Sequence, residues 1–268
     1  MDVVTTSEPI RLVQISDTHL EPEEGGTLLG MDTDRSLRYV LDLVQRDNAR
    51  IDLMLATGDI STHGTPQAYQ RFAHYMQSFD APVVWLPGNH DDNAVMAEHC
   101  GSEEAMAGHI VIGDWLIIML DSTIPRQVGG RVEQAELDRM ASLAAQYADK
   151  HVLVACHHPP LTIDCEWIDP QRISNGEAFL DALVALPNVK LLICGHIHQH
   201  WETSYRGLPI MSTPSTCIQF KPLQEDFILD ELSPGYRWFD LCADGTFRTG
   251  ISRVEGVEFS FDMNSGGY

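Results

Sequence analysis

Short apolar runs alternate with amphipathic segments through the first two-thirds of the chain. Five of these runs have the length and composition of buried strands, at residues 11–15, 53–56, 83–86, 152–155 and 191–194. Apolar residues at helical spacing predict helices over about 34–47, 66–78, 133–147 and 175–186, and a weaker one over 93–107. Strands that alternate with helices predict an α/β architecture.

A second pattern, typical of antiparallel strands, appears in two places. Residues 110–112 and 115–120 are apolar and are joined by Gly113-Asp114, which indicates a hairpin. The region from about 200 to 255 is β-rich, with turns expected at 206–207, 234–235 and 244–245. Because no repeat or interdomain linker interrupts the chain, we expect one domain over 1–268, with a loose start at 1–10, an irregular loop at 21–30 and a frayed end at 264–268.

Composition narrows the class of protein. The 268 residues are 44% hydrophobic, which is enough for a sizeable core, but no apolar run has the length of a membrane span. The formal net charge of −22 argues against a nucleic-acid or anionic-membrane partner. The first residues lack the features of a secretory signal, and the six cysteines are scattered. We therefore expect a cytoplasmic protein, and the β-rich end leaves a homodimer open.

Polar side chains follow each of the five buried runs. The clusters are Asp17 and His19, Asp59, Asn89 and His90, His157 and His158, and His196 and His198. Because ligands bind beyond the carboxyl ends of strands in open α/β sheets, all five clusters should face one crevice. A random scatter of the twelve histidines would not fall repeatedly at strand ends.

The residue types in these clusters indicate metal chemistry. Two carboxylates, an amide and several imidazoles, with no thiolate, suit divalent Mn, Fe, Co or Zn. The set is too large for one ion, whereas two ions that share a carboxylate would use it fully. Such a pair serves an in-line displacement at phosphorus. Two dications with two aspartates also sum to a local charge of about +2, which would attract an anionic substrate to an acidic protein.

The motifs Asp17-x-His19, Gly58-Asp59, Gly88-Asn89-His90-Asp91, His157-His158-Pro159 and Gly195-His196-x-His198 occur in this order. Together they resemble the five motifs of the calcineurin-like dinuclear metallophosphoesterases. The segments 28–33, 213–222 and 234–237 resemble the bacterial class III cyclic AMP phosphodiesterase branch of that family. The resemblance covers about residues 11–241 and implies a four-layer α/β/β/α sandwich.

The resemblance also implies residue roles. One metal would be bound by Asp17, His19, Asp59 and His198. The other would be bound by Asp59, Asn89, His157 and His196, with Asp59 as the bridge. His90 would protonate the leaving 3′ oxygen and Asp91 would orient His90. Substrate would contact His19, Asp59, Asn89, His90 and His198.

The implied reaction is hydrolysis of 3′,5′-cyclic AMP to 5′-AMP by a metal-bound hydroxide, with two divalent ions per chain. Fe²⁺ or Mn²⁺ is expected, and Zn²⁺ or Co²⁺ would also suit the ligands. One departure concerns Thr62, which stands where many family members carry an acidic residue.

Several alternatives stay open at this point. The same centre could cleave a glycerophosphodiester, a 2′,3′-cyclic nucleotide or a nucleotide pyrophosphate, and some proteins of this fold are non-catalytic scaffolds. His158 is expected to have a structural role rather than to bind a metal, and His63 lies in a loop close to Asp59. Trp167 and Phe220 could stack on a nucleobase, but core or subunit packing is the expected role.

Overall fold

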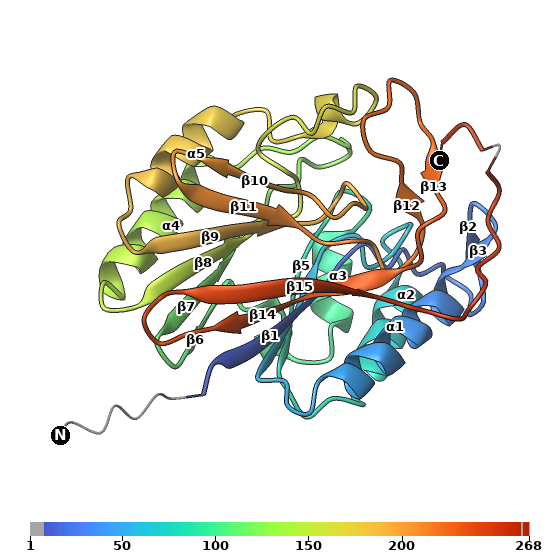
Figure 1. Cartoon of the computed structure of the whole chain (residues 1–268), viewed down its shortest axis with the longest axis horizontal. Helices are drawn as coiled ribbons and strands as arrows, with labels where there is room; N and C mark the ends of the chain where they lie inside the picture. The colour runs from blue at the N-terminus through green and yellow to red at the C-terminus, as the bar shows by residue number, and fades with distance from the viewer. Residues whose placement is uncertain (1–7, 264, 268) are drawn as a thin grey trace.

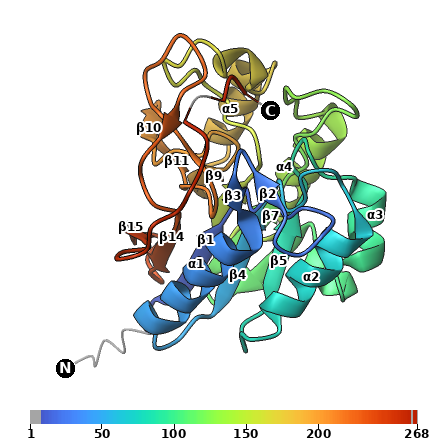
Figure 2. The same cartoon turned by 90° about the vertical axis from the view of Figure 1, so that its right-hand side faces the viewer.

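Two β-sheets pack face to face, and helices cover the outer face of each sheet (Figures 1 and 2). The structure is a computed structural model, and it describes residues 8–263 and 265–267. This arrangement confirms the predicted α/β/β/α sandwich. Of the loose leader expected at 1–10, residues 1–7 lie outside the described residues, and Ile10 already begins a strand.

The first sheet has the strand order β15-β14-β1-β4-β5. Its parallel half consists of β1 (Ile10–Ile15), β4 (Leu53–Thr57) and β5 (Val83–Leu86). The antiparallel edge consists of β14 (Gly235–Leu241) and β15 (Phe247–Arg253). The predicted turn at 244–245 joins these last two strands, whereas Gly235 lies at the start of β14 rather than in a hairpin turn.

The second sheet has the order β10-β11-β9-β8-β7-β6. Its parallel strands are β7 (Trp115–Met119), β8 (His151–Ala155), β9 (Val189–Cys194) and β11 (Leu208–Ser212). The antiparallel edges are β6 (His109–Ile112) and β10 (Glu202–Tyr205). The hairpin predicted around residues 113–114 is present, and the turn predicted at 206–207 joins β10 to β11.

The long helices are close to their predicted positions. They are α1 (Thr33–Asp47), α2 (Pro66–Met76), α4 (Gln134–Gln146) and α5 (Gly176–Val184). Asp32 caps α1 by accepting a hydrogen bond from the Arg35 amide at 2.8 Å. The weak helix expected over 93–107 is instead α3 (Asn93–His99) followed by a short 3₁₀ turn, η1 (Glu103–Met106). Gly101 separates the two because its φ of 88° cannot continue a helix.

Three apolar layers hold the four structural layers together. The middle layer lies between the sheets and includes Leu12, Leu55, Phe239, Ile117, Leu153 and Ile193. A second layer packs α1 and α2 against the first sheet, and a third packs α4 and α5 against the second sheet. The middle layer fixes the distance between the carboxyl ends of the strands in the two sheets.

Two small hairpins lie outside the main sheets. One pairs β2 (Thr27–Leu28), which lies in the loop expected at 21–30, with β3 (Met31–Asp32), which follows that loop. The other pairs β12 (Gln219–Phe220) with β13 (Leu229–Asp230). A second short 3₁₀ turn, η2 (Asp169–Gln171), precedes α5.

The chain after β15 runs beside α1 and the β2–β3 hairpin (Figure 1). There the Asp262 amide donates to the Leu29 carbonyl at 2.7 Å. Of the end expected to be frayed, Asn264 and Tyr268 lie outside the described residues, whereas Gly266 and Gly267 line a cavity. Within the described ranges, no helix has the length and apolar character required to cross a bilayer.

Candidate metal centre

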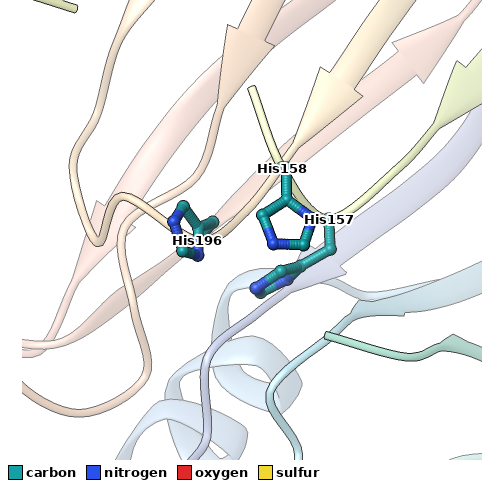
Figure 3. Close-up of side chains that lie close together, drawn as sticks. All are labelled: His157, His158 and His196. Atoms are coloured by element: carbon teal, nitrogen blue, oxygen red, sulfur yellow. The ribbon is translucent and has the colours of Figure 1, made fainter. Parts of the chain in front are cut away.

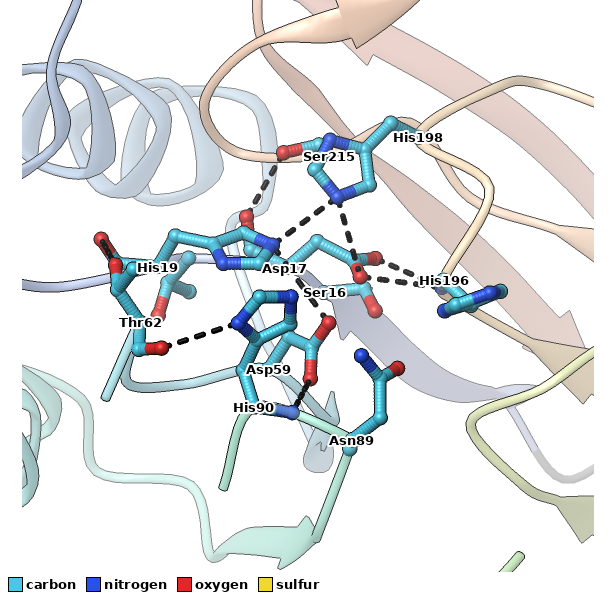
Figure 4. Close-up of polar contacts among 12 residues, drawn as sticks. Ser16, Asp17, His19, Asp59, Thr62, Asn89, His90, His196, His198 and Ser215 are labelled. Atoms are coloured by element: carbon cyan, nitrogen blue, oxygen red, sulfur yellow. Dashed lines mark hydrogen bonds and ion pairs between the residues drawn. The ribbon is translucent and has the colours of Figure 1, made fainter. Parts of the chain in front are cut away.

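The predicted ligands meet at the carboxyl ends of five strands. Asp17 and His19 follow β1, Asp59 follows β4, and Asn89 follows β5 in the first sheet; His157 follows β8, and His196 and His198 follow β9 in the second. Figure 4 shows most of these side chains directed toward one another from the two sheets. The centre therefore bridges the sandwich, and Asp17, His19 and His157 are fully buried within it.

The backbone at this centre is unusual. Five of the predicted ligands have left-handed φ values, at 56° for Asp17, 45° for His19, 51° for Asp59, 70° for His196 and 49° for His198. Residues other than glycine adopt this conformation at a free-energy cost, and such residues cluster at functional sites. Hydrogen bonds between loops hold them, for example from the His19 amide to the Asp59 carbonyl at 2.9 Å.

One group of ligand atoms forms around His19 and His198. Their Nε2 atoms lie 3.1 Å apart. The Nε2 atom of His198 lies 3.5 Å from Asp17 Oδ1, and that of His19 lies 3.7 Å from Asp59 Oδ2. Two imidazole nitrogens that face one another beside two carboxylates form a natural cation site.

A second group forms around His157. Its Nε2 atom lies 3.2 Å from Asp59 Oδ2 and 3.2 Å from Asn89 Oδ1. Figure 3 shows His196 close to His157. The centroids of the two rings lie 5.1 Å apart. The buried Nε2 atom of His196 has no hydrogen-bond partner among the described residues. Asp59 Oδ2 belongs to both groups, which is the position of a bridging ligand.

These distances fit divalent ions. Nitrogen and oxygen ligands lie about 2.0–2.2 Å from Zn²⁺ and similar ions, so two ligands of one ion are about 3–3.5 Å apart. Most of the separations above fall close to this range. The nitrogen–oxygen ligand set and the shared carboxylate thus suit a dinuclear divalent metal centre.

Backbone carbonyls orient the imidazole rings. His157 Nδ1 donates to the Thr57 carbonyl at 2.8 Å, and His198 Nδ1 donates to the Ile218 carbonyl at 2.9 Å. Each bond engages Nδ1 and leaves Nε2 as the nitrogen that faces the centre and can bind an ion. These acceptors could not be predicted from the sequence, because every residue type carries a backbone carbonyl group.

The buried carboxylate and imidazole groups of the centre shift one another's pKa values. Burial opposes ionisation of Asp59, but His157, His90 and His19 outweigh it and hold the pKa of Asp59 well below its usual value. Burial would likewise lower the pKa of His157, yet Asp59 raises that pKa to about 9. Burial lowers the pKa of His19 and His196, so both rings are neutral at physiological pH.

His90 lies at the edge of the centre. Its amide donates to Asp59 Oδ1 at 2.9 Å, and its ring Nδ1 donates to the Thr62 carbonyl at 3.0 Å. Nε2 is therefore the ring nitrogen on the opposite side from Thr62. The Thr62 hydroxyl donates to the His19 carbonyl at 2.8 Å. Thr62, which stands where many family members carry an acidic residue, therefore stabilises the loop that carries His19.

Asp91, which the resemblance predicts to orient His90, joins the loops on either side of that residue. Its carboxylate accepts hydrogen bonds from the amides of Ile60, Ser61 and Gly88 and from the Tyr69 hydroxyl, at 2.9–3.2 Å. Burial and the nearby Asp59 raise the pKa of Asp91 to about 6. Its carboxylate therefore ties the loops after β4 and β5 together, and the ring of His90 also contacts the Thr62 carbonyl.

His158 supports a neighbouring loop. The Ser122 hydroxyl lies 2.9 Å from its Nδ1, and its Nε2 donates to the Val128 carbonyl at 3.2 Å. Burial and His157 lower the pKa of His158 to about 3, which keeps the ring neutral. With both nitrogens engaged, His158 has the structural role expected from the sequence. His63 lies 3.4 Å from Glu21 in the adjoining cavity and holds none of the ligands.

A four-layer sandwich that places two connected cation sites at the ends of its central strands defines a dinuclear metallohydrolase. Comparison with protein families identifies the family. Residues 10–200 match the model of the calcineurin-like phosphoesterases, and the chain belongs to that family.

Curated relatives match the chain over nearly its whole length. It is 41% identical to the 3′,5′-cyclic adenosine monophosphate phosphodiesterase CpdA of Pseudomonas aeruginosa, with 98% of this chain and 97% of that protein covered. It is 38% identical to CpdA of Escherichia coli K12, with 97% and 95% covered. A dimetal phosphatase from Danio rerio has a similar fold, with 14% identity, a TM-score of 0.64 and coverage of 93% of this chain and 100% of that one.

Substitution of Gly88 tests whether the backbone after β5 must lie against Asp59. A Cβ atom at this position would collide with the Asp59 carboxylate and backbone. We expect Gly88→Ala to displace Asp59 and to lower the bound metal from two ions per chain to one or none, as measured by elemental analysis. Gly129→Ala is the matched control, because its Cβ would make only ordinary contacts, at 3.6 Å. Two ions in Gly88→Ala would contradict this account of the loop.

Metal binding should release a proton from His157. Because the pKa of His157 is raised to about 9 in the metal-free chain, its ring is protonated at neutral pH and must lose that proton to bind an ion. We expect release of about one proton per chain at about pH 7, with affinity that rises with pH until release vanishes near pH 10. Calorimetry in buffers of different ionisation enthalpy measures this number. His157→Gln should release about one proton fewer, and equal release by both proteins would refute the assignment.

Proposed function

We propose that this protein hydrolyses 3′,5′-cyclic AMP to 5′-AMP at a dinuclear metal centre. The observation that carries the proposal is the shared Asp59 oxygen, which lies 3.2 Å from His157 Nε2 and 3.7 Å from His19 Nε2, with His90 beside it. Two ions clamped by one carboxylate serve displacement at a phosphodiester. The names and coverage of the curated relatives support cyclic AMP as the substrate.

The proposed ligands follow the two groups of atoms. Asp17, His19, Asp59 and His198 would hold one ion, and Asp59, Asn89, His157 and His196 would hold the other. Fe²⁺ and Mn²⁺ suit this mixture of imidazole, carboxylate and amide ligands, as do Zn²⁺ and Co²⁺. A cytoplasmic location belongs to the same proposal, because six free cysteines suit a reducing compartment.

When bound, the two ions supply positive charge for the phosphate and activate the attacking water. The side chains of the chain then position the substrate. His19, Asp59, Asn89, His90 and His198 surround the place where the phosphate would lie, and the Asn89 amide nitrogen can donate to a phosphoryl oxygen. In the reaction, the water oxygen forms a bond to phosphorus while the bond from phosphorus to the 3′ oxygen breaks.

His90 would provide the proton that the 3′ oxygen needs to leave. With Nδ1–H donating to Thr62, a protonated His90 carries its second N–H on Nε2, and this proton is the one to be transferred. The Thr62 carbonyl thus engages one ring nitrogen and leaves Nε2 as the nitrogen that can carry the transferable proton.

A substrate panel tests the proposal. With Mn²⁺ bound, kcat/KM should be higher for cyclic AMP than for 2′,3′-cyclic AMP, a glycerophosphodiester, a nucleotide pyrophosphate or bis(p-nitrophenyl) phosphate. Chromatography should identify 5′-AMP as the product. A higher kcat/KM for another diester would identify that diester, rather than cyclic AMP, as the substrate. Two bound ions without hydrolysis of any diester would favour a non-catalytic scaffold protein.

His90→Ala separates proton transfer from metal binding. We expect the variant to keep both ions and to lose about 10²–10⁴-fold in kcat on cyclic AMP, the usual contribution of a general acid. The loss should be smaller for bis(p-nitrophenyl) phosphate, whose leaving group needs no proton. His63→Ala is the control, because this neighbouring histidine has a side chain that is 62% exposed. Loss of metal from His90→Ala would show a structural role instead.

A further inference from the structure

A cavity of about 390 Å³ opens from the metal centre and has a wall that the mechanism above does not use. Its floor contains Asp59, Asn89, His90 and His196 from the centre. Its wall is aromatic and is formed by Trp167, Phe220 and Phe227. The volume lies within the range of small-molecule sites, which bury apolar parts of a ligand against such walls.

Phe220 connects this wall to the metal centre. Its ring stacks on His198, with centroids 4.1 Å apart and planes 10° apart. Phe220 is only 3% exposed, so its main role is to pack against the ring of His198. Trp167 and Phe227 each contact it edge to face, at 5.0 and 5.4 Å, and extend the wall away from His198.

Trp167 and Phe227 retain accessible surface beside the cavity. Both are half-buried, and they come from different segments, before η2 and between β12 and β13. Their rings lie 4.9 Å apart in an edge-to-face contact. The Trp167 indole N–H has no hydrogen-bond partner in the described part of the chain, so ring packing alone sets its position.

Polar groups accompany the aromatic wall. Asp226 and Gln171 line the same cavity and could bond to the edge of a flat ligand. Polar groups placed beside an apolar wall are typical of sites that orient a small molecule. The neighbouring cavity of about 560 Å³ also reaches Asn89 and His90, but the described residues that line it include no tryptophan, phenylalanine or tyrosine on which a base could stack.

We propose that Trp167 and Phe227 form the nucleobase subsite, where the base of a nucleotide stacks while its phosphate occupies the metal centre. The proposal rests on the function proposed above and adds the part of the protein that recognises the base. Stacking on an aromatic side chain contributes about 1–3 kcal/mol per base and tolerates different bases. The wall therefore favours nucleotides over other phosphate esters and does not itself separate adenine from guanine.

Equilibrium binding of three phosphates to the Mn²⁺-loaded protein tests the subsite. The ligands are 5′-AMP, ribose 5-phosphate, which lacks the base, and inorganic phosphate. We expect Trp167→Ala to lower the affinity for 5′-AMP by about 5–100-fold, in line with the loss of one stacked base. The affinities for ribose 5-phosphate and inorganic phosphate should be unchanged. Phe227→Ala should act in the same direction, and Trp167→Phe should restore most of the affinity.

Two controls make the result specific. Leu223→Ala alters the same β12–β13 connection at a side chain that is 70% exposed, so all three affinities should be unchanged. Binding of 5′-AMP, but not of ribose 5-phosphate, should alter tryptophan fluorescence, and Trp167→Phe should remove that change. Metal content of each variant shows whether the centre is intact.

The failures can be told apart. If the wild-type protein binds all three phosphates and Trp167→Ala binds 5′-AMP as tightly as before, the subsite is wrong and the proposed function stands. If the wild-type protein binds none of them, both proposals fail. Equal weakening of all three ligands would show that Trp167 only supports the centre. A changed sedimentation coefficient with unchanged 5′-AMP affinity would assign the wall to packing between copies of the chain.

Discussion

A buried carboxylate that must be balanced by positive charge is the constraint on which this structure depends. Asp59 is 2% exposed, and a charge in such a place is tolerated only when it is paired. Its two oxygens face the His90 amide and the His157 ring. Gly88 permits this approach, since any larger residue would occupy the space of the carboxylate. The loops around the centre are shaped by the need to surround one negative group closely.

The same need makes the two sheets interdependent. Asp17 follows β1 in the first sheet, and both of its oxygens lie 3.1 Å from the amide nitrogen of His196, which follows β9 in the second. The apolar layer between the sheets sets the separation at which this bond forms. Dense packing transmits small displacements, so a change in this layer would reach the centre. The core between the sheets is therefore part of the functional apparatus.

Features of the centre could be predicted from the sequence where side chains form them, and could not where backbone groups form them. The strand ends and the convergence of the candidate ligands were readable, because Asp17, His157 and His198 are chemically distinctive at recurring positions. The carbonyl groups that orient the rings were not readable, and neither was the true partner set of Asp91, because backbone groups of any residue can fill these roles. The short β2–β3 hairpin was missed because strands of two residues have no detectable periodicity.

The buried charges of the centre link metal binding to attraction of the substrate. Although burial opposes it, Asp59 raises the pKa of the His157 ring to about 9, so the proton on this ring offsets part of the charge of Asp59. Two divalent ions held by the same ligands would take the place of that proton and would make the local charge positive. A protein with a net charge of −22 repels anions over most of its surface. Attraction of an anionic diester therefore depends on the loaded centre, so metal binding supplies substrate capture as well as chemistry.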